Sequence, residues 1–385
     1  MRVLLKPTVL LAPADDGYLA FDLATEQLFR LNALAALIVE LADGCKTQGE
    51  ILSVVVPLLG QSSAAECAKW IAQASEQGLL IDASTAPAIP ALTADELCDR
   101  ATQLRNTDRV LAAFLCQQRA TELAPDDPDR WYRLGELAHI VGRRVDARTA
   151  YERYQESFPD DAEVEHLLIA LRDETPPGRA SDRCIEQLYA HFASFYDQNM
   201  CGDLDYRAPQ LLFDSLAAAW GRRRELVALD VGCGTGLFGK QLAPVARRLV
   251  GIDLSAEMID LARERGIYDQ LEKAELTQWL GRPAVELYDV IAICDTLIYF
   301  GDLNQVLPSA ARHLAPGGVL GFTVEKGEQS PFRLTESGRF THHQDHLLAV
   351  ADSAGYQLVS QREEILRYEY GQPVAGWVTV LLKAT

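Results

Sequence analysis

Three glycines at alternate positions, directly after an apolar run, carry the clearest chemical signal in the sequence. They are Gly232, Gly234 and Gly236 in LVALDVGCGTGLFGK, residues 226–240. A glycine-rich turn between a strand and a helix can hold a phosphate, a dinucleotide or another adenosine-bearing ligand against the backbone. A second apolar run lies within RRLVGIDLS, residues 247–255. It ends at Asp253, which is 19 residues after Gly234. An acidic side chain at this point can accept hydrogen bonds from both hydroxyls of a ribose.

The spacing of the glycines separates these ligand classes. A P-loop requires Gly-Lys-Ser/Thr at the end of the turn, whereas this turn ends in Gly-Leu-Phe. A dinucleotide site prefers Gly-x-Gly-x-x-Gly, from which this turn differs by one residue. The pattern DVGCGTG, followed by GIDLS and MIDLARERG, resembles class I S-adenosylmethionine-dependent methyltransferases. The resemblance implies a Rossmann-like, seven-stranded α/β domain over 183–385, with S-adenosylmethionine as the cofactor.

The resemblance also implies roles for individual residues. Asp295 and Tyr299, in YDVIAICDTLIYFGDL, are expected near the methionine end of the cofactor and are candidates for catalysis. Glu275 stands where the family usually has an Asp that contacts the adenine. An arginine before the first strand of the domain would hold the cofactor's carboxylate, or would only stabilise a helix start. The full set expected to contact the cofactor is Asp230, Gly232, Gly234, Gly236, Asp253, Leu254, Met258, Glu275, Asp295, Tyr196, Tyr206 and Arg207.

A histidine-rich segment, THHQDH, follows near the end of the chain. The i, i+4 spacing of His342 and His346 is compatible with two metal ligands on one helix face. No third well-placed ligand is evident and the family resemblance implies no metal, so we expect none. His342 matches the histidine of a Gly-Arg-Tyr-x-His segment in methyltransferases that carry helical repeats. It is therefore predicted as an acid–base group or substrate contact, the alternative being polarity at a helix start.

The middle of the chain contains a repeat of 34 residues. Pro125 and Pro159 are 34 positions apart, as are Ala113 and Ala147. Two small residues, Gly135 and Ala147, would let two antiparallel helices approach each other closely. The residues with the spacing of a tetratricopeptide unit are Trp131, Leu134, Gly135, Ala138, Gly142, Ala147, Tyr151 and Pro159. We expect tetratricopeptide-like helices over 94–172, with DAEVEHLLIALRD as a capping helix. Two repeats are compatible with a spacer or with a peptide-binding role.

Short strands followed by helices are expected over residues 1–88. Extended stretches at 8–12, 17–22 and 27–31 precede a helix from Asn32 to Gly44. A second helix is predicted after Thr47, where Glu50 completes a capping box. A third covers about 63–77, and GLLID closes the unit. This order of elements is typical of a winged helix-turn-helix.

The stretch LFRLNALAALIVELADGCKTQGEIL in this segment resembles PqqD-like recognition elements of peptide natural-product pathways. In that family the domain binds a leader peptide as an added strand. Carried over, the peptide-binding edge is Gln27, Leu28, Phe29, Arg30 and Leu31. DNA binding is excluded on charge, because residues 1–90 contain five Lys/Arg against ten Asp/Glu. The alternative is a small domain that only packs on the rest of the chain.

The composition agrees with a folded protein that binds neither nucleic acid nor a membrane. The formal net charge is −19, which opposes contact with a phosphate backbone. No apolar run is long enough to span a bilayer. The eight cysteines include no C-x-x-C pair, which favours free thiols in the cytoplasm.

The combination of segments predicts a methyltransferase that tailors a ribosomally synthesised precursor peptide. The N-terminal segment would hold the leader, the repeats would set the distance, and the C-terminal domain would methylate the core. Tethering raises the local concentration of the core, so the active site itself need not bind it tightly. Two alternatives stay open at this point: an assembly factor whose repeats bind a protein partner, and a small-molecule methyltransferase with accessory domains.

Overall fold

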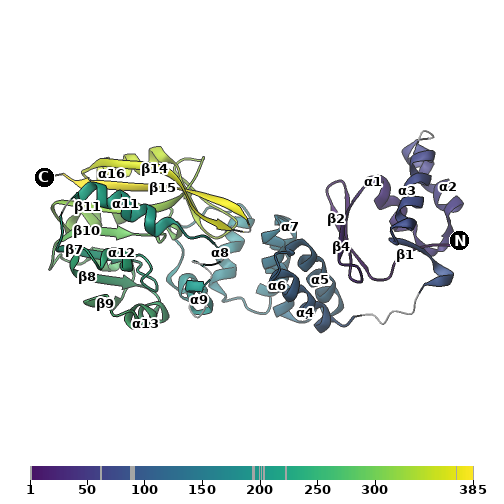
Figure 1. The fold of residues 1–385 in the computed structure, drawn as a ribbon, viewed down its shortest axis with the longest axis horizontal. Helices are drawn as coiled ribbons and strands as arrows, with labels where there is room; N and C mark the ends of the chain where they lie inside the picture. The colour runs from purple at the N-terminus through teal and green to yellow at the C-terminus, as the bar shows by residue number, and fades with distance from the viewer. Residues whose placement is uncertain are drawn as a thin grey trace. The chain divides into compact units, whose positions relative to one another are not determined.

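The computed structural model describes residues 2–60, 63–86, 92–192, 196–198, 200, 202, 204–221, 223–369 and 371–384. The chain folds into two compact units, Met1–Tyr154 and Gln155–Thr385 (Figure 1). No helix in this described part of the chain is both long and apolar enough to cross a membrane. The seven cysteines within it are free thiols.

Two small antiparallel sheets and three helices form the first part of the first unit (Figure 1, purple). One sheet has the order β2-β3-β4 and the other β5-β1-β6. Apolar side chains from the helices, among them Ile38, Ile51 and Ile71, make one buried core with the strands. The elements are β1 Arg2–Leu5, β2 Val9–Ala14, β3 Gly17–Asp22, β4 Gln27–Asn32, α1 Ala33–Leu41, β5 Asp43–Thr47, α2 Gln48–Leu59, α3 Ala64–Glu76 and β6 Leu80–Asp82.

The helix starts predicted here are confirmed, but one helix end is wrong. The Asn32 side chain accepts a hydrogen bond from the Ala35 amide at 3.0 Å and caps α1. Thr47 and Glu50 form the expected capping box of α2. Helix α1 ends at Leu41 instead of Gly44. The chain after it pairs with β1 as strand β5, and this tertiary pairing overrides the glycine stop signal.

Four helices complete the first unit, and they repeat with the predicted period. They are α4 Ala94–Arg105, α5 Val110–Leu123, α6 Pro128–Ile140 and α7 Arg144–Gln155. The first residues of α4 and α6 are 34 positions apart, as are those of α5 and α7. Gly135 in α6 faces Tyr151 in α7, and a Cβ at Gly135 would lie 2.6 Å from the tyrosine ring. The small residue therefore sets how closely these two helices approach.

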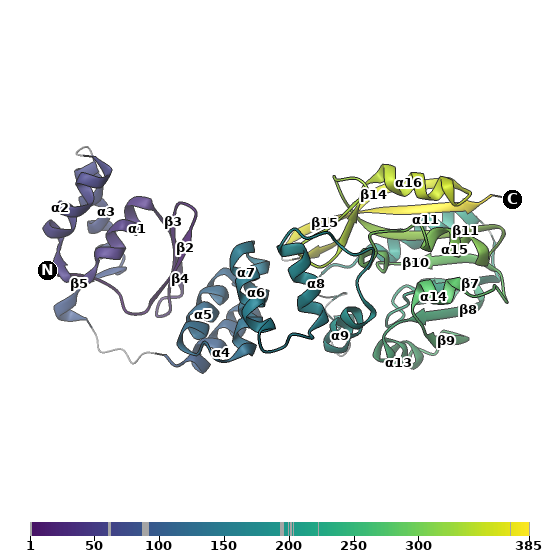
Figure 2. The same ribbon diagram turned by 180° about the vertical axis from the view of Figure 1, so that it is seen from behind.

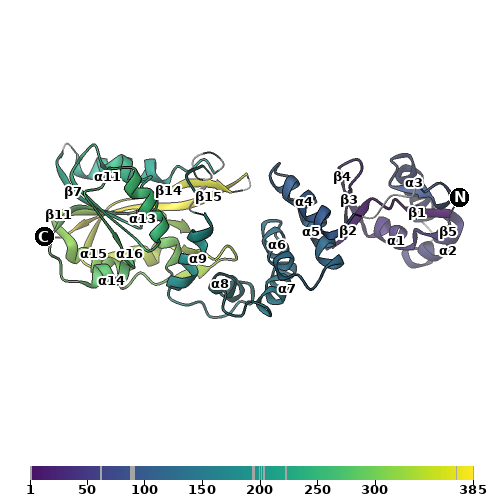
Figure 3. The same cartoon turned by 90° about the horizontal axis from the view of Figure 1, so that it is seen from below.

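A nine-stranded sheet with helices on both faces forms the second unit (Figures 2 and 3). Its main path is β12-β13-β11-β10-β7-β8-β9, and β15 pairs antiparallel with both β11 and β14. The expected seven strands are present, and two short ones, β12 and β13, are added. The strands are β7 Leu226–Val231, β8 Ala246–Asp253, β9 Gln270–Lys273, β10 Tyr288–Ile293, β11 Leu314–Lys326, β12 Phe332–Leu334, β13 Phe340–His342, β14 Tyr356–Glu369 and β15 Gln372–Lys383.

Two apolar clusters, one on each face, hold the helices to this sheet. One contains side chains of α14, α15 and α16, and the other contains side chains of α11 and α12. The central strand β7 is buried along its whole length, as expected for a parallel strand covered on both sides. The helices are α9 Asp182–Phe192, α10 Tyr196–Gln198, α11 Ala208–Trp220, α12 Gly239–Leu242, α13 Ala256–Glu264, α14 Leu276–Gly281, α15 Val306–His313 and α16 Gln344–Ser353.

Helix α8, Ala162–Leu171, belongs to this second unit. His166 Nε2 lies 2.9 Å from the carbonyl oxygen of Gly338. Ala170 packs with Leu334 and Phe340 in one apolar cluster. The sequence placed this helix with the repeats, in a domain ending at residue 172. Its contacts instead put the boundary near Tyr154.

The contact between Gly135 and Tyr151 leads to a stability prediction. We expect Gly135→Ala to lower the free energy of unfolding of the first unit by about 1–3 kcal/mol, because an added methyl overpacks the α6–α7 contact. Gly49→Ala is the control, since a Cβ added to this helical glycine would have no atom within 4 Å. Urea denaturation of both variants checks this, and equal stability of the two would contradict it.

Candidate functional site

A pocket opens at the carboxyl ends of strands β7, β8 and β10, where the parallel strands meet the glycine turn. It encloses roughly 650 Å³, including its opening to solvent. Eight of the residues predicted for the site line it: Tyr196, Gly232, Gly234, Asp253, Leu254, Met258, Glu275 and Asp295. Tyr299, predicted for catalysis, lines it as well.

The glycine turn has the conformation that its sequence predicts. Gly232 and Gly234 have φ values of +68° and +52°, in the region that favours glycine. A Cβ on Gly232 would lie 2.1 Å from Oγ1 of Thr296, so no larger residue fits there. Gly236, at φ +88°, does not line the pocket and packs against Arg265 and Tyr268. Gly236, expected among the cofactor contacts, instead allows close packing behind the turn.

Asp253 is fixed at the end of β8 by backbone donors. Its Oδ2 accepts a hydrogen bond from the Gly234 amide at 2.8 Å, and its Oδ1 accepts one from the Ser255 amide at 2.9 Å. Burial raises the pKa of this carboxyl, and the amide donors oppose the rise. Each oxygen has a further lone pair for a ligand. The geometry suits recognition of two neighbouring hydroxyls.

Glu275 lies in the same wall of the pocket as Asp253, at the start of α14. Its carboxylate caps the helix by accepting hydrogen bonds from the amides of Thr277 and Gln278 at 2.9 and 2.8 Å. The residue is 6% exposed. Capping therefore holds the carboxylate beside Ala274 and Leu276, the other two lining residues of this wall.

Asp230 lies behind the pocket instead of in it. Its Oδ2 accepts a hydrogen bond of 2.7 Å from the Tyr268 hydroxyl, and its Oδ1 has no hydrogen-bond partner among the described residues. Burial, with a smaller contribution from the charge of Asp253, raises the pKa of Asp230 to about 7. The predicted direct contact with a cofactor is thus replaced by a supporting position behind the turn.

Three tyrosines form the opposite wall. Tyr189 of α9 and Tyr196 of α10 meet Tyr299, and the hydroxyls of Tyr189 and Tyr299 are 3.0 Å apart. The ring centroid of Tyr189 lies 6.1 Å from that of Tyr196 and 6.0 Å from that of Tyr299, with edge-on geometry. Burial raises the pKa of Tyr299 to about 12, and that of the other two well above the usual range. These phenols are neutral, and all three residues line the pocket.

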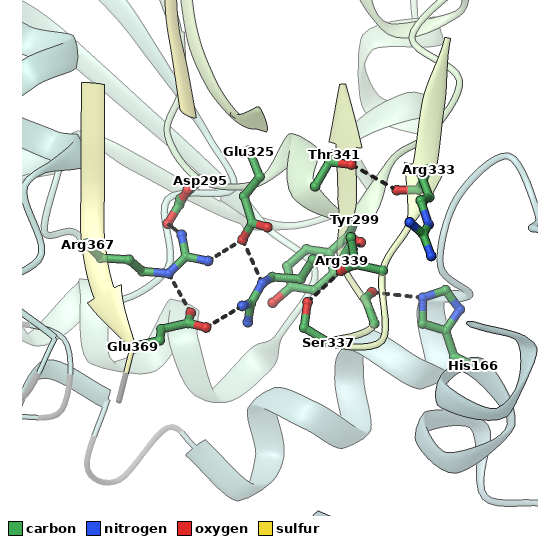
Figure 4. Close-up of polar contacts among 12 residues, drawn as sticks. His166, Asp295, Tyr299, Glu325, Arg333, Ser337, Arg339, Thr341, Arg367 and Glu369 are labelled. Carbon is green, nitrogen blue, oxygen red and sulfur yellow. Dashed lines mark hydrogen bonds and ion pairs between the residues drawn. The ribbon is translucent and has the colours of Figure 1, made fainter. Parts of the chain in front are cut away.

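Asp295 lines the pocket and contacts a buried ionic cluster, which Figure 4 shows together with Tyr299. Its Oδ2 is 3.0 Å from Nη1 of Arg367, while its Oδ1 has no hydrogen-bond partner among the described residues. Arg367 also contacts Glu325 and Glu369, and Arg339 contacts the same two glutamates. Burial raises the pKa of Asp295, and the charge of Arg367 opposes that rise.

His342 is not in this pocket, which corrects its predicted role. It ends strand β13, is 0% exposed, and neither ring nitrogen has a hydrogen-bond partner in the described structure. Its ring stacks on His346 at an interplanar angle of 7° and packs near Phe332. Burial lowers the pKa of His342 to about 4. The histidine is a neutral core residue without access to a substrate.

Tyr206 and Arg207 are not among the residues that line the pocket. The Tyr206 hydroxyl is 3.6 Å from Sγ of Cys294, and its ring packs behind that pocket residue. The Arg207 amide donates to the Leu366 carbonyl at 2.8 Å, while the side chain is half exposed beside Asp205. Arg207 directly precedes α11, which begins at Ala208, but its side chain makes no capping hydrogen bond.

Several residues of the site carry no motif and were missed. Arg179 and Ile185 come from the segment before the domain's first strand, and Thr296 and Phe300 from the loop after β10. In the ionic cluster, Glu325 comes from β11, Arg367 and Glu369 come from β14, and Arg339 comes from the residue before β13. A weak signal was available in RYE, residues 367–369, where two charges of opposite sign lie two positions apart on one strand face.

Comparison with known proteins agrees with this geometry. Residues 229–320 match the family model described as a methyltransferase domain. Nodulation protein S of Rhizobium tropici is 36% identical over 103 residues, which are 25% of this chain and 41% of that protein. Ubiquinone biosynthesis O-methyltransferase of Xanthomonas oryzae pv. oryzae is 26% identical over 140 residues, which are 33% of this chain and 59% of that protein. The chain thus spans between 41% and 59% of these two curated relatives.

Among solved structures, the N-methyltransferase NodS from Bradyrhizobium japonicum WM9, in complex with S-adenosyl-L-homocysteine, matches at a TM-score of 0.38 and 18% identity. The match covers 46% of this chain and 86% of that one. The family match runs from the strand before the glycine turn into β11. The second unit therefore carries a class I S-adenosylmethionine-dependent methyltransferase domain with a Rossmann-like fold, which confirms this part of the sequence prediction.

The burial of His342 generates a prediction on pH. The unfolded imidazole has its ordinary pKa of about 6.5, whereas the folded one has a pKa of about 4. Between these values the unfolded state takes up a proton that the folded state does not. We therefore expect the free energy of unfolding to fall by about 3 kcal/mol more in the wild type than in His342→Phe as the pH is lowered from 7 to 4.

Denaturation followed by tryptophan fluorescence measures this difference, because Trp377 Nε1 lies 3.3 Å from the His342 carbonyl oxygen. His343→Gln, at a partly exposed neighbouring position, is expected to keep the pH dependence of the wild type. Parallel pH profiles of wild type and His342→Phe would show that His342 is not the titrating group.

Proposed function

We propose that this chain is an S-adenosylmethionine-dependent methyltransferase that modifies a ribosomally synthesised precursor peptide. Residues 1–88 would bind the leader as a PqqD-like domain, the tetratricopeptide-like helices would act as a spacer, and the pocket of the second unit would methylate the core. The observation that carries the proposal is the open edge of strand β4 in a chain that also contains a methyltransferase domain.

The residues of the pocket fit the methyl donor. Asp253 suits the ribose hydroxyls, and Glu275 with Met258 suits the adenine side. The free Oδ1 of Asp295 and the tyrosine rings suit the positively charged end. Thr296 leaves no room for a side chain at Gly232. At this position the donor would therefore meet the protein backbone and no side chain.

The donor supplies a methyl group already activated by its positive sulfur. What the protein must add is alignment of the acceptor with that carbon and exclusion of water. Neutral Tyr189, Tyr196 and Tyr299 would exclude water from the reacting end. A carboxylate acceptor needs no general base. An acceptor that must lose a proton would have Asp295, one of three acidic residues that line the pocket, because His342 is buried elsewhere.

The open edge of β4 supports leader binding by strand addition. Strand β4 pairs with β3 on one side and with no described strand on the other. Leu28 on this strand is 43% exposed, which provides an apolar contact for an added strand. The excess of acidic residues in this segment, ten against five basic ones, favours a basic leader over nucleic acid.

Two other functions have specific support. The second curated relative is named for ubiquinone biosynthesis, which supports a small-molecule methyltransferase with accessory domains. The repeated helices α4–α7 support an assembly factor whose helices bind a protein partner. Both differ from the leading proposal in that neither requires the edge of β4.

The cofactor assignment predicts the effect of a change at Asp253. We expect Asp253→Ala to weaken S-adenosylmethionine binding by about one to two orders of magnitude, because the ribose loses its charged acceptor. Isothermal titration calorimetry measures it, with Asp260→Ala, an exposed acid on α13, as control. Full biological function in an Asp253→Ala variant that binds no cofactor would instead support the assembly factor.

The leader assignment predicts the effect of a charge on the open edge. We expect Leu28→Glu to raise KM for a candidate precursor, encoded next to the gene, by at least about tenfold, with kcat unchanged. A carboxylate on the edge opposes strand addition, and the loss of tethering lowers the local concentration of the core. Methylation of the leaderless core peptide should not change. Mass spectrometry of the products provides the rates.

Leu58→Glu is the matched control, because Leu58 is 68% exposed on α2, away from this strand edge. It is expected to keep the wild-type KM. Equal KM values for wild type and Leu28→Glu, or the same increase in Leu58→Glu, would contradict leader binding at β4.

A further inference from the structure

The ionic cluster beneath the pocket consists of a closed ring and one additional acid (Figure 4). In the ring, Arg367 contacts Glu325 and Glu369, and Arg339 contacts the same two glutamates. Nε of Arg367 is 2.7 Å from Glu369 Oε1, and Nη2 of Arg339 is 2.6 Å from Glu369 Oε2. Two arginines and two glutamates sum to zero charge. The ring is therefore complete without Asp295.

Asp295 adds one negative charge to this neutral ring. One oxygen, Oδ2, is bound to Arg367 at 3.0 Å, and the other, Oδ1, has no hydrogen-bond partner among the described residues although the side chain is only 7% exposed. Asp295 lines the pocket, and Oδ1 is the carboxylate oxygen that Arg367 does not engage. Its backbone has a φ of +55°, a strained conformation that only a few residue types adopt. Asp295 keeps this backbone conformation although the conformation is energetically unfavourable.

The surroundings of this oxygen suit a positive charge. Tyr189, Tyr196 and Tyr299 line the same end of the pocket, and aromatic faces attract cations. Arg179 is the basic residue among those lining the pocket, and its guanidinium is engaged by Asp182 and by the ring of Phe300. A buried carboxylate without a compensating cation is costly. Asp295 shares Arg367 with Glu325 and Glu369, so a positive charge on the ligand would add the compensation that Arg367 alone does not provide.

We propose that Asp295, held in place by Arg367, makes the pocket select the charged methyl donor over its neutral demethylated product. The proposal rests on the proposed function. S-adenosylmethionine and S-adenosylhomocysteine share an ammonium and a carboxylate, and differ in the sulfonium. When a lone pair of the acceptor forms the new bond to the methyl carbon, the electron pair of the broken carbon–sulfur bond stays on sulfur. The positive charge opposite Asp295 is then lost, and with it the attraction that retains the donor.

Arg367 is a positioning residue in this scheme, because it contacts Asp295 but does not line the pocket. Its three guanidinium nitrogens contact three different carboxylates, Asp295, Glu325 and Glu369. The fork geometry of arginine fixes the plane of the Asp295 carboxylate and leaves Oδ1 unengaged. Lysine keeps the charge but cannot bind three acids in this way.

Asp295→Asn is the decisive variant, because it removes the charge and preserves the shape. Asparagine tolerates positive φ, and the neutral ring stays intact, so folding should be retained. Calorimetric titrations would compare S-adenosylmethionine, S-adenosylhomocysteine and sinefungin, in which a protonated amine stands near the place of the sulfonium. We expect Asp295→Asn to weaken binding of the two cationic ligands by about tenfold and of S-adenosylhomocysteine by less than twofold.

Glu275→Gln is the matched control, since it removes one charge from the opposite wall of the same pocket. It should change the affinities for donor and product by the same factor. Arg367→Lys should reduce the preference for cationic ligands in part, while thermal unfolding without ligand reports any loss of fold.

The outcomes separate this inference from the proposed function. If wild type and Asp295→Asn bind all three ligands but with the same ratios, selection by charge is wrong and the cofactor assignment stands. An equal loss for donor and product would place the free oxygen against the ammonium that they share, and would also overturn the inference. If the wild type binds none of the three, the proposed function itself fails.

Discussion

The burial of Arg367 is the constraint on which the arrangement of the second unit depends. Its side chain is 3% exposed and neutralises acids from three places in the fold: the loop after β10, the end of β11 and β14 itself. A buried charge that loses its partner costs several kcal/mol. The strands that carry these groups must therefore keep their register. Strand β15 lies antiparallel between β11 and β14, so Glu325 on β11 and Arg367 on β14 reach the same end of the sheet from opposite sides of β15. The carboxyl end of β10 supplies Asp295 at this edge, where parallel strands present their ligand-binding loops.

The sequence predicts the donor half of the site well because that half is local. Gly232, Gly234 and Asp253 lie within 22 residues of one another, counted from Gly232 to Asp253, and their roles follow from one turn and two adjacent strands. The ionic cluster is not predictable in this way, because Arg367 finds Asp295 72 residues away through the register of three strands. His342 illustrates the same limit. Its motif suggested an acid–base group or a substrate contact, but the ring contacts that bury it are tertiary.

The first unit shows how far local signals extend and what they leave open. Caps at Asn32 and Thr47 determine where helices begin, since they depend on three neighbouring residues. The end of α1 depends on pairing with β1, which a glycine signal does not include. The 34-residue period determined the helices α4–α7, but the side chains of α8 that pack on Leu334 and Phe340 assigned that helix to the other unit.

In the proposed enzyme, a charged group recognises the methyl donor, whereas aromatic and apolar side chains surround the acceptor. The described pocket provides one unpaired carboxylate oxygen, which the donor's positive charge can satisfy, and beyond it mainly tyrosine and apolar walls. Such walls place an acceptor without recognising it strongly, since they offer few polar groups of fixed direction. Specificity for the acceptor would then have to come from elsewhere in the chain. A strand edge that binds a leader provides it, because tethering raises the concentration of the core at a pocket that need not bind it tightly.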